Sequence, residues 1–138
     1  MSDRALRLVM AALATAVVGI AGYLLQAHYS GGSIVCSTGG CETVQQSSYS
    51  EIFGIPVALV GLVGAVAILA SLVRGDLYGR ATGVALTLSG FIFAAYLVIV
   101  QLAVINAVCE WCIASDSLMT VMAAVALWRA RADVTERA

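Results

Sequence analysis

The sequence contains no lysine, one histidine and one proline, and charged residues make up only 11% of its 138 residues. A soluble domain is about a quarter charged, whereas this chain is 62% hydrophobic. The few charges form no basic face, which excludes nucleic acid as an expected partner. The sequence also has no phosphate-binding loop, so it indicates no bound nucleotide. This composition favours a protein embedded in the lipid bilayer.

Four apolar segments predict membrane-spanning helices, since about 20 apolar residues cross a bilayer. We expect them at residues 5–27, 56–73, 81–105 and 107–128. The first segment is longer than the ~7–15-residue apolar region of a cleaved signal, so we expect it to stay as a helix. Asn106 is a candidate N-cap for the fourth helix. The predicted fold class is all-α, with one membrane domain built as a four-helix bundle.

Positive charge and cysteine lie on opposite sides of these segments. The positive residues flank the first segment, the link between the second and third, and the end of the fourth; they are Arg4, Arg7, Arg74, Arg80, Arg129, Arg131 and Arg137. The other two connections hold Cys36, Cys41, Cys109 and Cys112. Cytoplasmic loops collect positive residues, and disulfides persist in oxidising compartments. We therefore expect a cytoplasmic-membrane protein with both termini in the cytoplasm and its cysteines on the extracytoplasmic side.

The outside connection of residues 28–54 is rich in glycine and serine and holds the first cysteine pair. Glycines around this pair indicate a mobile loop that a soluble protein can reach. The stretch Ser48-Tyr49-Ser50-Glu51 forms a capping-box pattern. Together with Ile52 and Phe53 it predicts a short helix at the membrane interface, before Pro56 opens the second span.

The second cysteine pair, Cys109-Glu-Trp-Cys112, is a C-x-x-C motif at the start of the fourth expected helix. Backbone N–H groups and the helix dipole favour an anion there, which predicts an unusually acidic first thiol. A thiolate of one pair can attack a disulfide of the other. Two pairs on one face of a membrane bundle therefore indicate a relay by thiol–disulfide exchange.

Other interpretations of the four cysteines stay open. They could form structural disulfides, bind zinc through four thiolates, or stay buried and unreactive. The first two would make the protein a non-enzymatic membrane scaffold. We favour the relay, with no metal, because two pairs, one face and four spans coincide.

Three motifs resemble the bacterial homologues of vitamin K epoxide reductase, and the resemblance covers nearly the whole chain. They are the pair Cys36…Cys41, the stretch from Ser47 to Pro56, and Cys109-Glu-Trp-Cys112 followed by Ser115. The resemblance implies an enzyme that reoxidises a thioredoxin-like extracytoplasmic protein for disulfide formation in exported proteins. Its electron acceptor would be a membrane quinone, ubiquinone or menaquinone. No thioredoxin-like domain follows the fourth segment, so we expect a separate partner.

The same resemblance implies a role for each matching position. Cys41 would exchange with the partner, Cys36 would pass electrons to Cys109, and Cys112 would face the quinone. Ser50 takes the place of a family serine or asparagine that lies close to the quinone head group.

Four more residues are candidates for the quinone site. Phe53 and Ile55 could line this site, or they could be buried in the lipid. Trp111 could shape the space between the cysteines, or anchor the chain at the interface. Asp116 stands where the animal enzymes have a tyrosine, which favours plain quinone reduction over reduction of vitamin K epoxide.

Overall fold

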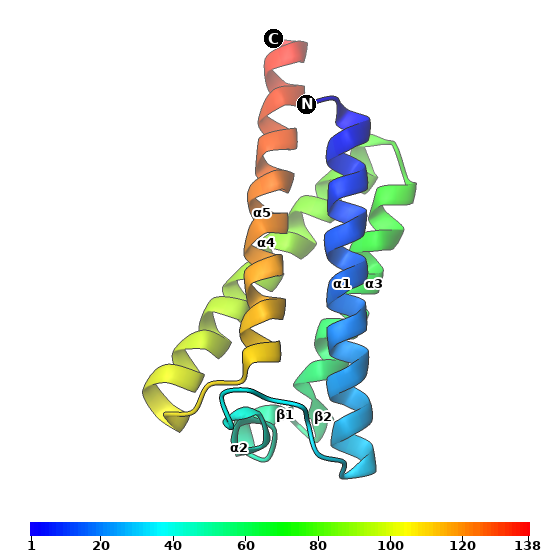
Figure 1. Ribbon diagram of the computed structural model, residues 1–138. Coiled ribbons are helices and arrows are strands. Elements are labelled where there is room, and N and C mark those ends of the chain that lie inside the picture. The colour runs from blue at the N-terminus through cyan, green and yellow to red at the C-terminus, as the bar shows by residue number, and fades with distance from the viewer.

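The computed structural model describes residues 1–138 as four long helices packed in a bundle (Figure 1). They are α1 (Asp3–Ser30), α3 (Val57–Val73), α4 (Leu77–Ile99) and α5 (Glu110–Arg137). A π-helical turn, Val100–Ile105, continues α4. The connection from α1 to α3 holds α2 (Cys41–Gln45), a 3-10 turn (Ser48–Ser50), and a hairpin of β1 (Glu51–Ile52) and β2 (Ile55–Pro56). The chain is thus mostly helical, as predicted.

The four long helices pack in a ring, in which α1 contacts α3 and α5, and α4 contacts the same two helices. Apolar side chains from all four helices form the core, namely Ala14, Val17, Ala65, Ile68, Ala94, Met119 and Met122. Gly90 lets α4 approach α5 closely, because a Cβ there would lie 2.7 Å from Met119 Sδ. Small residues at such crossings are typical of helices packed within membranes.

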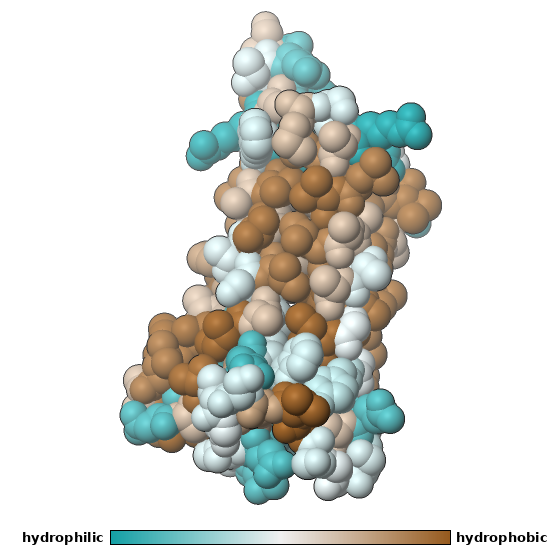
Figure 2. Space-filling model, in the orientation of Figure 1, coloured by the Kyte–Doolittle hydropathy of each residue, from teal (hydrophilic) through white to brown (hydrophobic).

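The outer surface of the bundle is apolar. On the face drawn in Figure 2, a broad hydrophobic band crosses the middle of the bundle, and hydrophilic groups lie at both ends. Three helices, α1, Leu77–Ile105 and α5, are long and apolar enough to cross a membrane. The fourth, α3, is apolar but has only 17 residues. The chain is therefore a helical membrane protein, and crossing by α3 stays a prediction.

The two ends of the bundle differ in chemistry. Both termini and the link from α3 to α4 lie at one end, and the loop with α2 lies at the other (Figure 1). Asp3 ties the first end together, since its carboxylate pairs with Arg129 at 2.8 Å and with Arg80 at 3.4 Å. Arg80 also pairs with Asp133. Arginines and cysteines thus occupy opposite ends, while the compartment that each end faces stays a prediction.

The short helix predicted from the capping box is not formed. The 3-10 turn stops at Ser50, and Glu51 opens β1. Glu51 Oε1 lies 2.9 Å from His28 Nε2, so this carboxylate contacts α1 and does not cap a helix. Phe53 and Gly54 make the hairpin turn with φ of 52° and 79°. The helix in this connection is α2, which lies earlier in the chain.

The start of the last helix also differs from the prediction. Asn106 does not cap it, because this residue ends the π-helical turn with φ of 55°. The N-cap is Cys109, whose Sγ accepts a hydrogen bond from Cys112 N at 3.3 Å. The helix is nevertheless long enough to span a bilayer, since it continues to Arg137.

Candidate redox site

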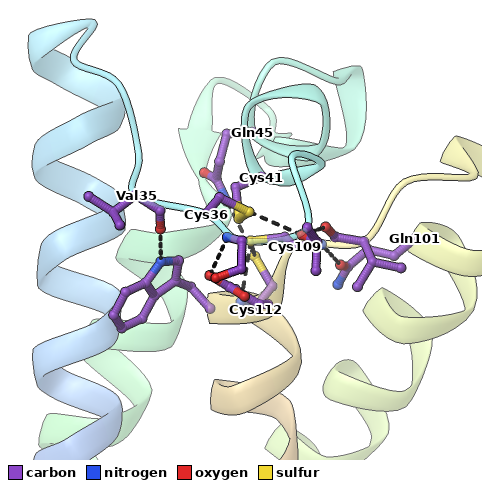
Figure 3. Close-up of a disulfide and its surroundings, with 12 residues drawn as sticks. Val35, Cys36, Cys41, Gln45, Gln101, Cys109 and Cys112 are labelled. Carbon is purple, nitrogen blue, oxygen red and sulfur yellow. Dashed lines mark hydrogen bonds between the residues drawn. A yellow bond between two sulfur atoms is a disulfide. The ribbon is translucent and has the colours of Figure 1, made fainter.

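The four cysteines come together at the loop end of the bundle (Figure 3). Cys36 and Cys41 form a disulfide, whereas Cys109 and Cys112 are free thiols. Cys41 and Cys109 are fully buried in one small apolar cluster with Val44, and the other two cysteines pack against it. A disulfide therefore lies beside a dithiol, which is the arrangement that thiol–disulfide exchange needs.

Cys109 is the more acidic thiol of the C-x-x-C motif. It precedes the membrane-length helix α5, and its Sγ accepts hydrogen bonds from the thiol of Cys112 at 2.6 Å and from the backbone N–H of Cys112. The hydrogen bond from the Cys112 thiol lowers the pKa of Cys109 to about 7, against the opposing effect of burial. The helix N-terminus favours the same anion. This agrees with the acidity predicted from the motif.

A buried glutamine holds Cys109 from the other side. Gln101 Oε1 accepts a hydrogen bond from Cys109 N at 2.9 Å, and this side chain is only 2% exposed. Gln101 lies in the π-helical turn, where its carbonyl oxygen accepts the bond from Asn106 N that closes the wider ring, and a further bond from Ala107 N. Such turns often occur at functional sites. The sequence marks Gln101 only as a polar residue near a helix end, because nothing in it predicts the π turn.

Gln45 is a second site residue that sequence reasoning missed. Its Nε2 donates a hydrogen bond to Cys112 Sγ at 3.4 Å. Gln45 lies one turn after Cys41 in α2, so both side chains are on one face of this helix. In Figure 3, Gln45 and Gln101 approach the cysteines from different sides. The spacing from Cys41 would have revealed Gln45 only if α2 had been predicted.

Three hydrogen bonds fasten the cysteine loop to the start of α5. They join Ser37 N to Glu110 Oε1 at 2.9 Å, Thr38 Oγ1 to Val108 O at 2.8 Å, and Trp111 Nε1 to Val35 O at 2.6 Å. Gly40 completes this contact, because a Cβ there would lie 2.8 Å from Val108 N and closer still to its carbonyl oxygen. The loop that the sequence predicts to be mobile is thus docked beside the C-x-x-C motif.

A cavity of about 610 Å³ lies between the end of α1 and the segment from α2 to β1. Gln45 and Ser50 both line it, and Gln45 also donates a hydrogen bond to Cys112. The Ser50 hydroxyl donates to Ser47 O at 2.8 Å. Neither this cavity nor the two at the arginine end of the bundle is lined by a cysteine.

The other predicted quinone-site residues lie in three different places. Trp111 packs against the cysteine cluster and against the Tyr23 ring, at a centroid distance of 5.2 Å. Asp116 is buried one turn beyond Cys112, and its Oδ2 has no hydrogen-bond partner. Phe53 and Ile55 are exposed on the hairpin and line none of these cavities.

A disulfide packed beside a free dithiol, at one end of a membrane helix bundle, is the arrangement of a membrane thiol oxidoreductase. The comparison with protein families agrees with this class. The chain matches the Vitamin K epoxide reductase family over residues 8–127, a stretch that includes all four cysteines, and it belongs to that family. No curated protein sequence matches the chain. The resemblance found from the motifs is therefore confirmed at the level of the family.

Proposed function

We propose that this protein oxidises a thioredoxin-like extracytoplasmic protein and passes the two electrons to a membrane quinone, ubiquinone or menaquinone. The observation that carries the proposal is the disulfide Cys36–Cys41 packed beside the free thiols of Cys109 and Cys112. Membership of the family supports oxidoreductase activity in general. The disulfide also argues against a zinc scaffold, because it leaves two free thiols where such a site uses four thiolates.

In the first half of the cycle the partner reduces the loop disulfide Cys36–Cys41. A thiolate of the partner attacks Cys41 and releases Cys36 as a thiolate. The second thiol of the partner then attacks the mixed disulfide and leaves as part of an oxidised partner. Cys36 and Cys41 now carry the two electrons that the partner has lost.

The second half moves these electrons to the C-x-x-C motif. Cys36 attacks Cys109 of an oxidised Cys109–Cys112 pair and releases Cys112. Cys41 then attacks Cys36, which restores the loop disulfide and releases Cys109. The result is one disulfide and one dithiol, the pairing found in the structure. In the proposed cycle this pairing precedes reduction of the acceptor.

In the last step Cys112 acts on the quinone while Cys109 closes the disulfide, and the quinol leaves with two electrons and two protons. The Cys112 thiol donates a hydrogen bond to Cys109 Sγ at an S–S distance of 2.6 Å. Its proton must first pass to Cys109 or to another base. Asp116 follows Cys112 by one turn on the same face of α5, and its Oδ2 is buried without a partner. We assign Asp116 the handling of protons at this step.

The cavity beside Ser50 suits the head group of the acceptor. Its volume of about 610 Å³ lies in the ~300–1,000 Å³ range of ligand sites. Polar residues line most of it, so it fits a quinone ring but not an apolar tail. Gln45 lines this cavity and also contacts Cys112, and we propose that its side chain turns aside to admit the ring. The exposed Phe53 and Ile55 would then contact the tail at the membrane surface.

The same proposal sets the orientation in the membrane. The cysteine end faces the extracytoplasmic side and both termini face the cytoplasm, as the arginine distribution indicates. All four long helices cross the bilayer in this arrangement. The 17 residues of α3 reach the lower limit of ~17–25 residues for a membrane span.

Mass-tagging of thiols in the purified full-length protein tests the relay. After reduction with a small dithiol, quinone should reoxidise Cys109 and Cys112 in the wild-type chain. Cys112→Ser should reduce no quinone, because Cys109 then has no partner thiol with which it can close a disulfide. Cys41→Ser should fail with a thioredoxin-like partner but still turn over small dithiols. Quinone reduction by Cys112→Ser, or stoichiometric zinc in the wild-type protein, would overturn the proposal.

A further inference from the structure

A second cavity, of about 520 Å³, lies at the end of the bundle opposite to the cysteines. It is formed where the ends of α1, α3, α4 and α5 meet, and its volume also lies within the ~300–1,000 Å³ range of ligand sites. The buried residues that line it include Met10 and Ala126, whereas Arg74 and Arg137 are among its exposed ones. The cavity therefore combines an apolar interior with a cationic opening.

Positive charge exceeds negative charge around this cavity. Five arginines line it, namely Arg7, Arg74, Arg80, Arg129 and Arg137. Asp133, in its lining, and Asp3 are the only carboxylates that pair with them, so three positive charges have no carboxylate partner. Arg7 donates instead to the carbonyl of Leu72. The guanidinium groups of Arg74 and Arg137 make no hydrogen bond or ion pair with the protein.

Two free guanidinium groups above an apolar pocket match an amphiphilic anion. Guanidinium groups bind phosphate oxygens in pairs, with a geometry that an ammonium lacks. The apolar lining distinguishes the site from one for a free inorganic anion, which would gain nothing from it. The cavity also lies at the end of membrane-length helices, where lipid head groups meet acyl chains.

We propose that this cavity binds an anionic phospholipid of the surrounding membrane. Its phosphate lies between Arg74 and Arg137, and an acyl chain runs along Leu88 and Ala126. The bound lipid joins the link between α3 and α4 to the end of α5. This site does not depend on the redox function proposed above, because it lies at the other end of the bundle.

Lipid titrations of the full-length protein in a neutral detergent test the proposal. Phosphatidylglycerol, phosphatidylcholine with the same acyl chains, and inorganic phosphate are added in separate series, and thermal unfolding and native mass spectrometry report binding. The double variant Arg74→Gln, Arg137→Gln removes the two free charges of the cavity. The double variant Arg4→Gln, Arg131→Gln is a matched control, because these arginines also have no partner but do not line this cavity.

Phosphatidylglycerol should bind the wild-type and control proteins more tightly than phosphatidylcholine does. The cavity variant should bind phosphatidylglycerol about tenfold more weakly, which corresponds to a loss of ~1.4 kcal/mol of charge-assisted bonding. Its affinity for phosphatidylcholine should equal that of the wild-type protein, which shows that the variant is folded. Three results would overturn the proposal: equal affinity for the two lipids, equal weakening in both double variants, or the same stabilisation by inorganic phosphate alone.

Discussion

The hydrogen bond from the backbone of Cys109 to Gln101 leads to a quantitative prediction about both the stability of the protein and the rate of its redox reaction. Both residues are buried, with Gln101 only 2% exposed and Cys109 fully enclosed. Gln101→Leu keeps a side chain of similar size but removes the acceptor for Cys109 N. A buried N–H without a partner costs about 1–3 kcal/mol. The free energy of unfolding should fall by this amount, which is a large fraction of the ~5–15 kcal/mol that holds a domain together.

The same substitution should slow the closure of the Cys109–Cys112 disulfide. Gln101 fixes the backbone of Cys109 at the N-cap of α5, and so it fixes the direction of the Sγ atom toward Cys112. The assay follows denaturant unfolding in detergent for stability, and mass-tagging of the two thiols after addition of quinone for rate. Gln46→Leu is the control for stability alone, because this glutamine is exposed at the end of α2 but lines the cavity proposed for the quinone. If Gln101→Leu loses no more stability than Gln46→Leu and closes its disulfide as fast as wild type, the positioning argument is wrong.

Three further predictions concern the same site. Gly40→Ala should force the cysteine loop away from α5, because a Cβ there would clash with backbone atoms of Val108. Electron transfer between the two cysteine pairs should then slow about tenfold for ~1.4 kcal/mol of strain. An unchanged rate would show that docking of the loop on α5 has no part in the mechanism. Gln45→Ala should speed alkylation of Cys112 by a small reagent, whereas Gln46→Ala should not, and equal rates would contradict the shielding of this thiol. The pKa of Cys109 is lowered to about 7, below the ~8.5 of an unfolded thiol, so its stabilisation of the dithiol form is complete above pH ~8.5 and is lost as the pH falls through about 7. The pH dependence of Cys109 alkylation checks the assignment, because the reactive thiolate should appear with a midpoint near pH 7, and a midpoint at or above ~8.5 would refute it.

The sequence alone predicted that the chain is a membrane protein and that its arginines and cysteines lie at opposite ends of the bundle. Apolar runs predict helices because each residue in a bilayer-length segment must be compatible with hydrocarbon, and this is a property of composition along the chain. The separation of arginines from cysteines needed only the order of segments. The cysteine pairs and the motif around Ser50 were enough to place the chain in its family.

The short elements between the helices were less predictable. The pattern Ser48-Tyr49-Ser50-Glu51 satisfies a local rule for a helix start, but Glu51 contacts His28 in α1 at 2.9 Å and the segment folds as a hairpin. Likewise Asn106 is a good capping residue, yet the π-helical turn leaves it in a left-handed conformation and makes Cys109 the cap. In the first place a contact with a distant segment overrode a local preference, and in the second the π-helical turn did so.

The sequence by itself therefore determined which segments are apolar, which end of the bundle holds the thiols, and which family the chain belongs to. Only the tertiary structure decided that Cys36 pairs with Cys41, that Gln45 and Gln101 hold the other two cysteines, and that the loop docks on α5. The reason is physical: hydropathy and charge act residue by residue along the chain. A hydrogen bond to a buried thiol or to its backbone exists only when segments far apart in the sequence meet at about 3 Å.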